Sequence, residues 1–359
     1  MLRDDGSRRC RGSGLVALGA LVLATSACLT FQNKPVELPA GAPGIYDFVD
    51  IDGVRLHVRD SGGGSHHAVL LIHGYASSMA TWVANFDALA AQHRVIAVDL
   101  KGFGESEKPA GDYSPAAQAT LLVHLLDQLG VDVADLVAHS YGCAVALRLA
   151  LDHPGRVGRL VLMSAWVYEE QLPTFFRLAR VPVVGETLFT LYYKEQPDAR
   201  IGSGFYDPQR VDESLVDAVK AAYDRPGAVA AAHAVARDQW LEVQDTHYTR
   251  LHHPSLLLWG RHDDTSGIEV GEQLEAELGD ARLVVLPRSA HFPMLERAAT
   301  VNHLMVEFLT PPATGNLDFA PAPTPQRAPT PAPEDDTARA DEEPAHSLPD
   351  DTPDAEEVP

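Results

Sequence analysis

Short runs rich in Val, Leu and Ile recur along the chain, and helical stretches separate most of them. Continuous apolar strands that alternate with helices are typical of a parallel sheet covered on both faces. Ahead of these runs, Ile45–Asp50 and Val54–Asp60 flank Asp52-Gly53, a strong hairpin turn signal. The sequence therefore predicts an α/β fold whose mostly parallel sheet begins with an antiparallel hairpin. The apolar runs are 69–73, 94–98, 134–138, 157–163, 255–259 and 282–286.

Polar residues follow three of these predicted strands in the chain order serine, acid, histidine. Ser140 lies between an apolar strand and a helix of small residues, Asp263 follows a second strand, and His291 follows a third. In open parallel sheets, sites form at the carboxyl ends of the strands. A serine hydroxyl is a poor nucleophile unless a base takes its proton, and an acid can orient that base. The order predicts nucleophilic catalysis, whereas a lone serine here would more simply be a helix N-cap.

These motifs resemble those of the capped α/β-hydrolase superfamily over roughly residues 45–309. The elbow at 138–142 reads Ala-His-Ser-Tyr-Gly and departs from G-x-S-x-G, because alanine stands where the first glycine is expected. A His-Gly pair, His73-Gly74, ends an earlier strand, and a glycine-containing loop follows Asp99. The resemblance implies an α/β-hydrolase fold with a mostly parallel sheet, an antiparallel N-terminal hairpin, helices on both faces and a helical cap.

The resemblance further implies a catalytic triad of Ser140, Asp263 and His291. Asp263 stands at the family spacing Gly-x-x-Asp after Gly260, and Asp264 would serve instead if the loop is shifted by one residue. The proline that usually follows the acid is missing, and Thr-Ser-Gly stand at 265–267. The acid of such a triad holds the imidazole in the right tautomer.

Two backbone N–H groups, those of Tyr75 and Tyr141, are assigned by the resemblance to the oxyanion hole. The Tyr75 ring could instead line the pocket. His73 and His139 are interpreted as structural residues of their turns, and so is the loop that begins at Asp99. No metal and no cofactor is predicted, and the glycine-rich loop lacks the lysine-serine pair of a phosphate site.

Between about residues 166 and 246 the strand pattern lapses, where the superfamily inserts a cap between the two parts of the hydrolase core, 45–165 and 247–310. Such a cap excludes water and shapes the acyl pocket. Helices are expected at 173–180, 186–193, 211–222 and 228–240. Aromatic residues of the cap indicate an apolar or aromatic substrate, or else form the core of the cap itself. They are Trp166, Tyr168, Phe175, Phe176, Phe189, Tyr192, Tyr193 and Trp240.

A serine nucleophile argues against the haloalkane dehalogenase and epoxide hydrolase branches, which use aspartate at that position. The resemblance implies a serine hydrolase that cleaves a small apolar or aromatic carboxylic ester through an acyl-enzyme. Cleavage of a carbon–carbon or amide bond by the same machinery is the first alternative. A catalytically inactive hydrolase fold, used as an envelope scaffold or binding protein, is the second.

Residues 1–27 are typical of an export signal. Arginines precede an apolar stretch, Leu15–Ala24, that is too short for a permanent membrane span, and small residues then lead directly to Cys28. The pattern resembles a bacterial lipoprotein signal peptide, which implies a lipidated Cys28, a linker over 28–44 and an anchor in the cell envelope. Leu29 after the cysteine resembles the pattern of outer-membrane sorting, if the host has two membranes. An ordinary secretory signal or an uncleaved anchor is the alternative.

The last 49 residues, 311–359, differ in composition from the rest of the chain. They hold 12 of the 26 prolines, and 12 acids against two arginines supply −10 of the formal net charge of −22. With almost no large apolar residues, the segment cannot offset its ordering entropy and is predicted to be disordered. The acidic balance argues against nucleic acid or an anionic membrane surface as a partner.

Cys143, on the helix after Ser140, is predicted to be a small buried hydrophobe.

Overall fold

The computed structural model describes residues 29–31, 46–193, 201–241 and 248–310. The predicted signal peptide, Cys28, most of the predicted linker and the acidic tail lie outside these segments. Within them, none of the helices combines the length and the apolarity that crossing a bilayer requires.

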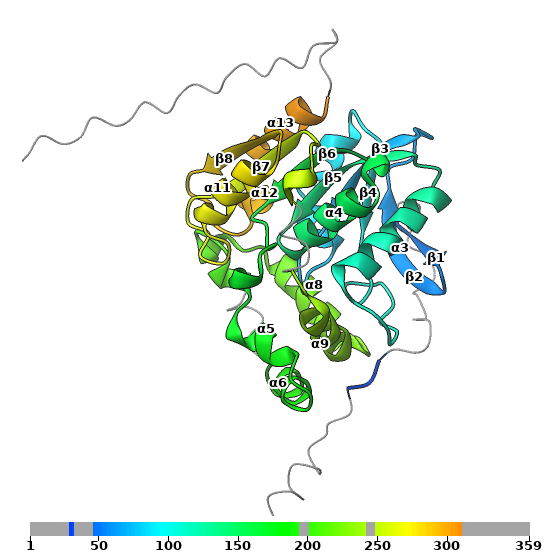
Figure 1. Ribbon diagram of the computed structural model, residues 1–359, viewed down its shortest axis with the longest axis vertical. Helices are drawn as coiled ribbons and strands as arrows, with labels where there is room; N and C mark the ends of the chain where they lie inside the picture. The colour runs from blue at the N-terminus through cyan, green and yellow to red at the C-terminus, as the bar shows by residue number, and fades with distance from the viewer. Residues whose placement is uncertain (1–28, 32–45, 194–200, 242–247, 311–359) are drawn as a thin grey trace, which may run out of the picture. The chain divides into compact units, whose positions relative to one another are not determined.

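An eight-stranded sheet forms the centre of the fold, with the strand order β1-β2-β4-β3-β5-β6-β7-β8 (Figure 1). In this order, every pair from β4–β3 to β7–β8 is parallel. The pairs β1–β2 and β2–β4 are antiparallel, so β1 and β2 form the antiparallel edge that the sequence predicts. The strands are β1 Tyr46–Ile51, β2 Val54–Asp60, β3 His67–Ile72, β4 Val95–Val98, β5 Val133–His139, β6 Val157–Met163, β7 Ser255–Gly260 and β8 Ala281–Leu286.

Helices pack on both faces of the sheet. Neighbouring residues of a strand point to opposite faces, so each strand contributes side chains to two cores. Leu70 and Ile72 contribute to a core shared with α3, α4 and α11, whereas Val69 and Leu71 contribute to a second core shared with α2, α12 and α13. This is why the strands read as continuous apolar runs. The helices are α2 Phe86–Ala90, α3 Pro115–Gln128, α4 Tyr141–Asp152, α11 Ile268–Glu277, α12 Pro293–Glu296 and α13 Ala298–Leu309.

The segment between β6 and β7 contributes no strand in its described residues, and its α-helices there include α5, α6, α8 and α9 (Figure 1). Helices α5, α6 and α9 pack against one another, and α8 packs on α9. Their bounds agree with the predicted helical segments to within a few residues. They are α5 Thr174–Ala179, α6 Val184–Tyr192, α8 Glu213–Asp224 and α9 Ala228–Asp238.

After the strand that ends at His73-Gly74, the sequence also predicts a single helix near Ser78 to Ala91, and this prediction is wrong. The structure has a 3₁₀ helix at Met79–Trp82 and then the short α2. The break lies at Asn85, whose buried side-chain amide donates to Met294 O (3.1 Å) and to the amide oxygen of Asn302 (2.7 Å). Those partners lie far along the chain, so no local pattern reveals the break.

Gly142 allows α4 to approach the end of β3 very closely. A Cβ at this position would lie 2.6 Å from the carbonyl oxygens of both Ile72 and His73. Because both neighbours are backbone atoms, neither can rotate out of the way. The glycine is therefore required by packing, whereas the alanine at the other glycine position of the elbow, Ala138, is fully buried within β5.

Gly142→Ala should therefore lower the free energy of unfolding by about 1–3 kcal/mol, the usual cost of overpacking. Urea denaturation measures the change. Gly155→Ala is the matched control, because a Cβ there would have nothing within 4 Å. Equal stability of the two variants would show that α4 can shift to make room.

Candidate active site

Ser140 sits on a strained turn between β5 and α4. Its φ is +51° and its ψ is −122°, a conformation that residues with a side chain rarely adopt. The end of β6 holds the turn, because the Ser140 N–H donates to Met163 O (3.0 Å) and the Ser140 carbonyl accepts from Trp166 N (3.2 Å). The turn raises the serine hydroxyl above the carboxyl end of the sheet.

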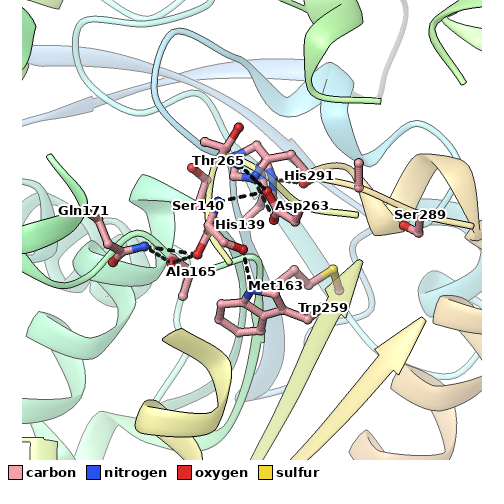
Figure 2. A network of polar contacts seen from close by, with 12 residues as sticks. His139, Ser140, Met163, Ala165, Gln171, Trp259, Asp263, Thr265, Ser289 and His291 are labelled. Atoms are coloured by element: carbon pink, nitrogen blue, oxygen red, sulfur yellow. Dashed lines mark hydrogen bonds and ion pairs between the residues drawn. The ribbon is translucent and has the colours of Figure 1, made fainter. Parts of the chain in front are cut away.

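The structure brings together the three residues of the predicted triad (Figure 2). Ser140 Oγ lies 3.1 Å from Nε2 of His291, and Nδ1 of His291 lies 3.0 and 3.1 Å from the two carboxylate oxygens of Asp263. Nδ1–H therefore donates to the acid, which leaves Nε2 free to accept the serine proton. All three side chains are buried.

Asp263 is held as a carboxylate by its surroundings. Burial alone would raise its pKa, but the charge of His291, the hydrogen bond from His291 and the amide of Ser266 together keep the pKa below its ordinary value. The N–H groups of Thr265 and Ser266 both donate to Asp263 Oδ1, at 3.0 and 2.9 Å. A proline at either position would have no amide hydrogen to give. The neighbouring Asp264 is exposed.

The two predicted oxyanion donors belong to residues near the serine. Tyr141 is the first residue of α4, so its N–H has no partner within the helix. Tyr75 follows Gly74, where a Cβ would lie 3.1 Å from the Cβ of Ser140. The Tyr75 ring does line the pocket, and its hydroxyl donates to Ala232 O of α9 (2.9 Å).

His73 and His139 each form hydrogen bonds that fix the backbone around the site, in agreement with the structural role that the sequence predicts for them. His73 Nδ1–H donates to Gly74 O (2.7 Å), and its Nε2 accepts from Leu100 N (3.0 Å). His139 Nε2–H donates to the carbonyl oxygen of His291 (2.7 Å). Burial, and then the nearby charge of His291, lowers the pKa of His139 to about 3. His139 therefore stays neutral and fixes the backbone that carries His291.

A cavity of about 410 Å³ opens onto Ser140 and His291. Helices of the cap segment line one side of it, and the turn at 74–77 lines the other. Among its described lining residues there is neither a lysine nor an arginine. The largest of its apolar and aromatic lining residues are Tyr75, Trp166, Phe175, Phe176, Tyr193, Tyr223 and Phe292.

The cap aromatics divide between the two roles that the sequence leaves open. Trp166, Phe175, Phe176 and Tyr193 line the cavity, whereas Phe189 is fully buried among the cap helices. Sequence reasoning missed five further lining residues of the segment between β6 and β7. Two of them stand four residues apart on α8, a spacing that places them on one helix face. The five are Pro173, Ile201, Gly204, Val219 and Tyr223.

A second cavity, of about 600 Å³, lies beyond α8 and contains no residue of the predicted triad. We therefore place the site in the smaller cavity.

Cys143 is fully buried, and burial raises the pKa of its thiol, which suits a packing role and not a nucleophile. The described residues include no cluster of side chains suited to hold a metal ion.

The family model for the alpha/beta hydrolase fold matches residues 67–298. The chain belongs to this family. An uncharacterised protein of Mycobacterium tuberculosis is 30% identical over 292 residues, which cover 78% of this chain and 85% of that protein. A 2-hydroxymuconate semialdehyde hydrolase of a Pseudomonas species is 29% identical over 299 residues, covering 76% and 97%.

Solved structures of the alpha/beta hydrolase family share the fold. An alpha/beta hydrolase fold protein from Burkholderia ambifaria superposes with a TM-score of 0.66 at 23% identity, covering 74% of this chain and 98% of the other. The sheet order, the position of the predicted triad and these likenesses agree on a hydrolase fold.

His139 should make this hydrolase less stable in acid. Below its ordinary pKa of 6.5 the unfolded histidine binds a proton, whereas the folded one does so only near pH 3. Because the unfolded state then binds more protons, stability should fall by about 1.4 kcal/mol per pH unit through this one group. In His139→Gln, urea denaturation at pH 7, 6, 5 and 4 should show a slope smaller by that amount.

The matched control is His303→Gln, which removes an exposed histidine on α13 and should leave the slope unchanged. An unaltered slope in His139→Gln would mean that His139 is protonated in the folded protein.

Proposed function

We propose that this chain is a serine hydrolase that cleaves an uncharged carboxylic ester through an acyl-enzyme. The observation that carries the proposal is the continuous hydrogen-bonded line from Ser140 Oγ through His291 to Asp263 (Figure 2). It lies in an apolar cavity, where the fixed dipoles of the site act more strongly than they do in water.

In this reaction Ser140 Oγ bonds to the acyl carbon while His291 Nε2 takes the serine proton. The carbonyl oxygen becomes an oxyanion, and the N–H groups of Tyr75 and Tyr141 donate to it. When the intermediate collapses, the ester C–O bond breaks and His291 gives the proton to the leaving alkoxide. Water, activated by the same imidazole, then attacks the acyl-enzyme and releases the acid and Ser140.

The lining of the cavity supports a neutral acyl group. A carboxylate in an apolar pocket needs a paired cation, and the described lining supplies neither lysine nor arginine. His139 cannot serve, because its low pKa keeps it neutral. We therefore favour esters of modest apolar or aromatic acids.

Carbon–carbon bond cleavage is the second candidate, because a relative is named as a hydrolase of 2-hydroxymuconate semialdehyde. That substrate carries a carboxylate, which the described lining does not match. The two candidates share the triad and differ in the charge of the substrate.

Ser140→Ala should abolish labelling by a fluorescent phosphonate and lower kcat on p-nitrophenyl butyrate by roughly 10⁴-fold or more. The reason is that no other hydroxyl of the described residues contacts His291 Nε2. Gel fluorescence and initial rates measure the two effects. Labelling that survives in the variant would assign the nucleophile elsewhere.

Two acid variants form a matched pair for this test. Asp263→Asn should lower kcat by about 10⁴-fold, since an amide no longer fixes the imidazole tautomer. Asp264→Asn, at an exposed neighbour, should stay within a few-fold of the original enzyme. The reverse order would move the acid by one residue.

The charge preference can be tested with p-nitrophenyl butyrate and p-nitrophenyl hydrogen succinate, whose acyl chains have the same length. The succinate should show a kcat/KM lower by 10²-fold or more, because burying its free carboxylate without a partner costs several kcal/mol. Steady-state rates for both esters at pH 7 give the ratio. Equal rates, or faster cleavage of a 2-hydroxy-6-oxodienoate than of either ester, would favour the second candidate.

A further inference from the structure

The outer side of the cap segment carries a group of exposed apolar side chains. Residues 181–184 comprise the end of the turn after α5 and the first residue of α6, and all four are apolar and exposed. Large exposed apolar groups of this kind mark protein or membrane contacts. We term the following residues the cap patch: Leu178, Val181, Val183, Val184, Leu191 and Trp240.

Helix α6 is apolar on two sides, although only one of them is covered. Gly185, Phe189 and Tyr193 recur every four residues and are buried toward the rest of the cap. Val184 and Leu191 stand seven residues apart, so they share a different face, and Leu191 is 57% exposed. A helix with apolar residues on both sides is expected to be covered on both.

The turn holds Val183 in a conformation that β-branched residues avoid, with φ of +68°. Its N–H donates to Glu186 Oε2 (2.7 Å), and its carbonyl accepts from the Thr187 hydroxyl (2.7 Å). Glycine at this position would remove the strain, which costs about 1–3 kcal/mol. Despite this strain, the position carries an apolar side chain that is 39% exposed.

The described N-terminal residues are connected to this patch through a series of contacts. Phe31 stacks on Tyr113 with ring centroids 6.2 Å apart. The Tyr113 N–H donates to Asp238 at the end of α9 (3.1 Å). Cys28 stands three residues before Phe31 in the sequence.

From the end of α9, the contacts continue into the patch. Trp240 follows Asp238 by two residues and is 53% exposed. The Arg180 guanidinium lies 4.0 Å from the centre of the Trp240 ring. Arg180 directly precedes Val181, so a series of contacts and chain neighbours leads from Phe31 to the patch.

We propose that the cap patch inserts into the surface of the bilayer in which Cys28 is anchored. The proposal rests on the lipidation predicted for Cys28, and it is independent of the reaction at Ser140. Exposed aliphatic residues with a tryptophan at their edge suit the boundary between head groups and acyl chains. The net charge of −22 disfavours attraction to anionic lipid, so the partner is a zwitterionic bilayer that receives apolar side chains.

Docking in this way would place the cap between the membrane and the catalytic cavity. Phe175 and Phe176 of α5 line the cavity on the inner side, while Leu178 and Val181 are exposed on the outer side. An apolar substrate dissolved in the bilayer would then be presented to the cap first.

Trp240 provides the readout for a test with the purified full chain. The other tryptophans, Trp82, Trp166 and Trp259, are buried. Phosphatidylcholine vesicles whose acyl chains carry bromine, a contact quencher, should remove most of the Trp240 emission. Subtracting the spectrum of Trp240→Phe isolates that emission. The double variant Val181→Asp with Val184→Asp should lose the quenching and still sediment with vesicles through its N-terminus.

Val83→Asp is the matched control, because Val83 is 71% exposed and lies outside the patch; this variant should keep the quenching. Hydrolysis of a soluble ester without vesicles shows whether each variant folds, and Leu191→Asp replaces the double variant if that one does not. Unquenched Trp240 in the original chain, or quenching that persists in the patch variants, would overturn the proposal. A blue-shifted Trp240 in a vesicle-free dimer would assign the patch to a second copy of the chain.

Discussion

The strained backbone at Ser140 is the constraint on which the rest of the site depends. A residue with φ near +51° costs about 1–3 kcal/mol and persists only where its surroundings fix it. Here the end of β6 binds the Ser140 N–H, and Trp166 N binds its carbonyl. Gly142 lets α4 start directly against the end of β3. The same arrangement makes Tyr141 the first residue of α4, where its N–H has no partner within the helix, so the positions of the proposed nucleophile and of one proposed oxyanion donor have a single cause.

The proposed acid and base, Asp263 and His291, are positioned by a second close contact between backbones. A Cβ at Gly260, the last residue of β7, would lie 2.1 Å from Ala290 O, so the loops that carry Asp263 and His291 touch directly. His262 N donates to Ser289 O (2.9 Å) and ties these loops together. The hydrogen bond from His139 Nε2 to the carbonyl oxygen of His291 fixes the backbone of His291 as well. The distances between the proposed catalytic groups are therefore set by packing at the carboxyl ends of adjacent strands, which leaves the cap free to determine the substrate.

The sequence predicts most of the sheet and the three residues that meet above it, because both follow from local patterns: apolar runs, and polar residues where those runs end. Reasoning from pattern fails where a distant partner decides the outcome. The helix expected from Ser78 ends early because Asn85 bonds to Asn302, 217 residues away. Because the usual proline after the acid is missing, the sequence leaves open whether Asp263 or Asp264 is the acid. In the structure the N–H groups of Thr265 and Ser266 both donate to Asp263, which a proline at either position could not do. Val219 and Tyr223 line the cavity only because α8 packs above it.

The cap segment is joined to the loop that carries His291 through one carboxylate. Glu296 accepts from Tyr206 N of the segment between β6 and β7 (2.6 Å) and from Ala290 N of the histidine loop (2.7 Å). Nearby, His291 N donates to Gly204 O (2.9 Å), and the rings of Phe205 and Phe292 stack. These contacts join residues of the segment between β6 and β7 to the loop of the proposed base. A displacement of the cap is therefore expected to change the position of His291. In the proposed membrane-docked state, the lipid that contacts the cap would therefore influence the position of the proposed base as well as access to the cavity.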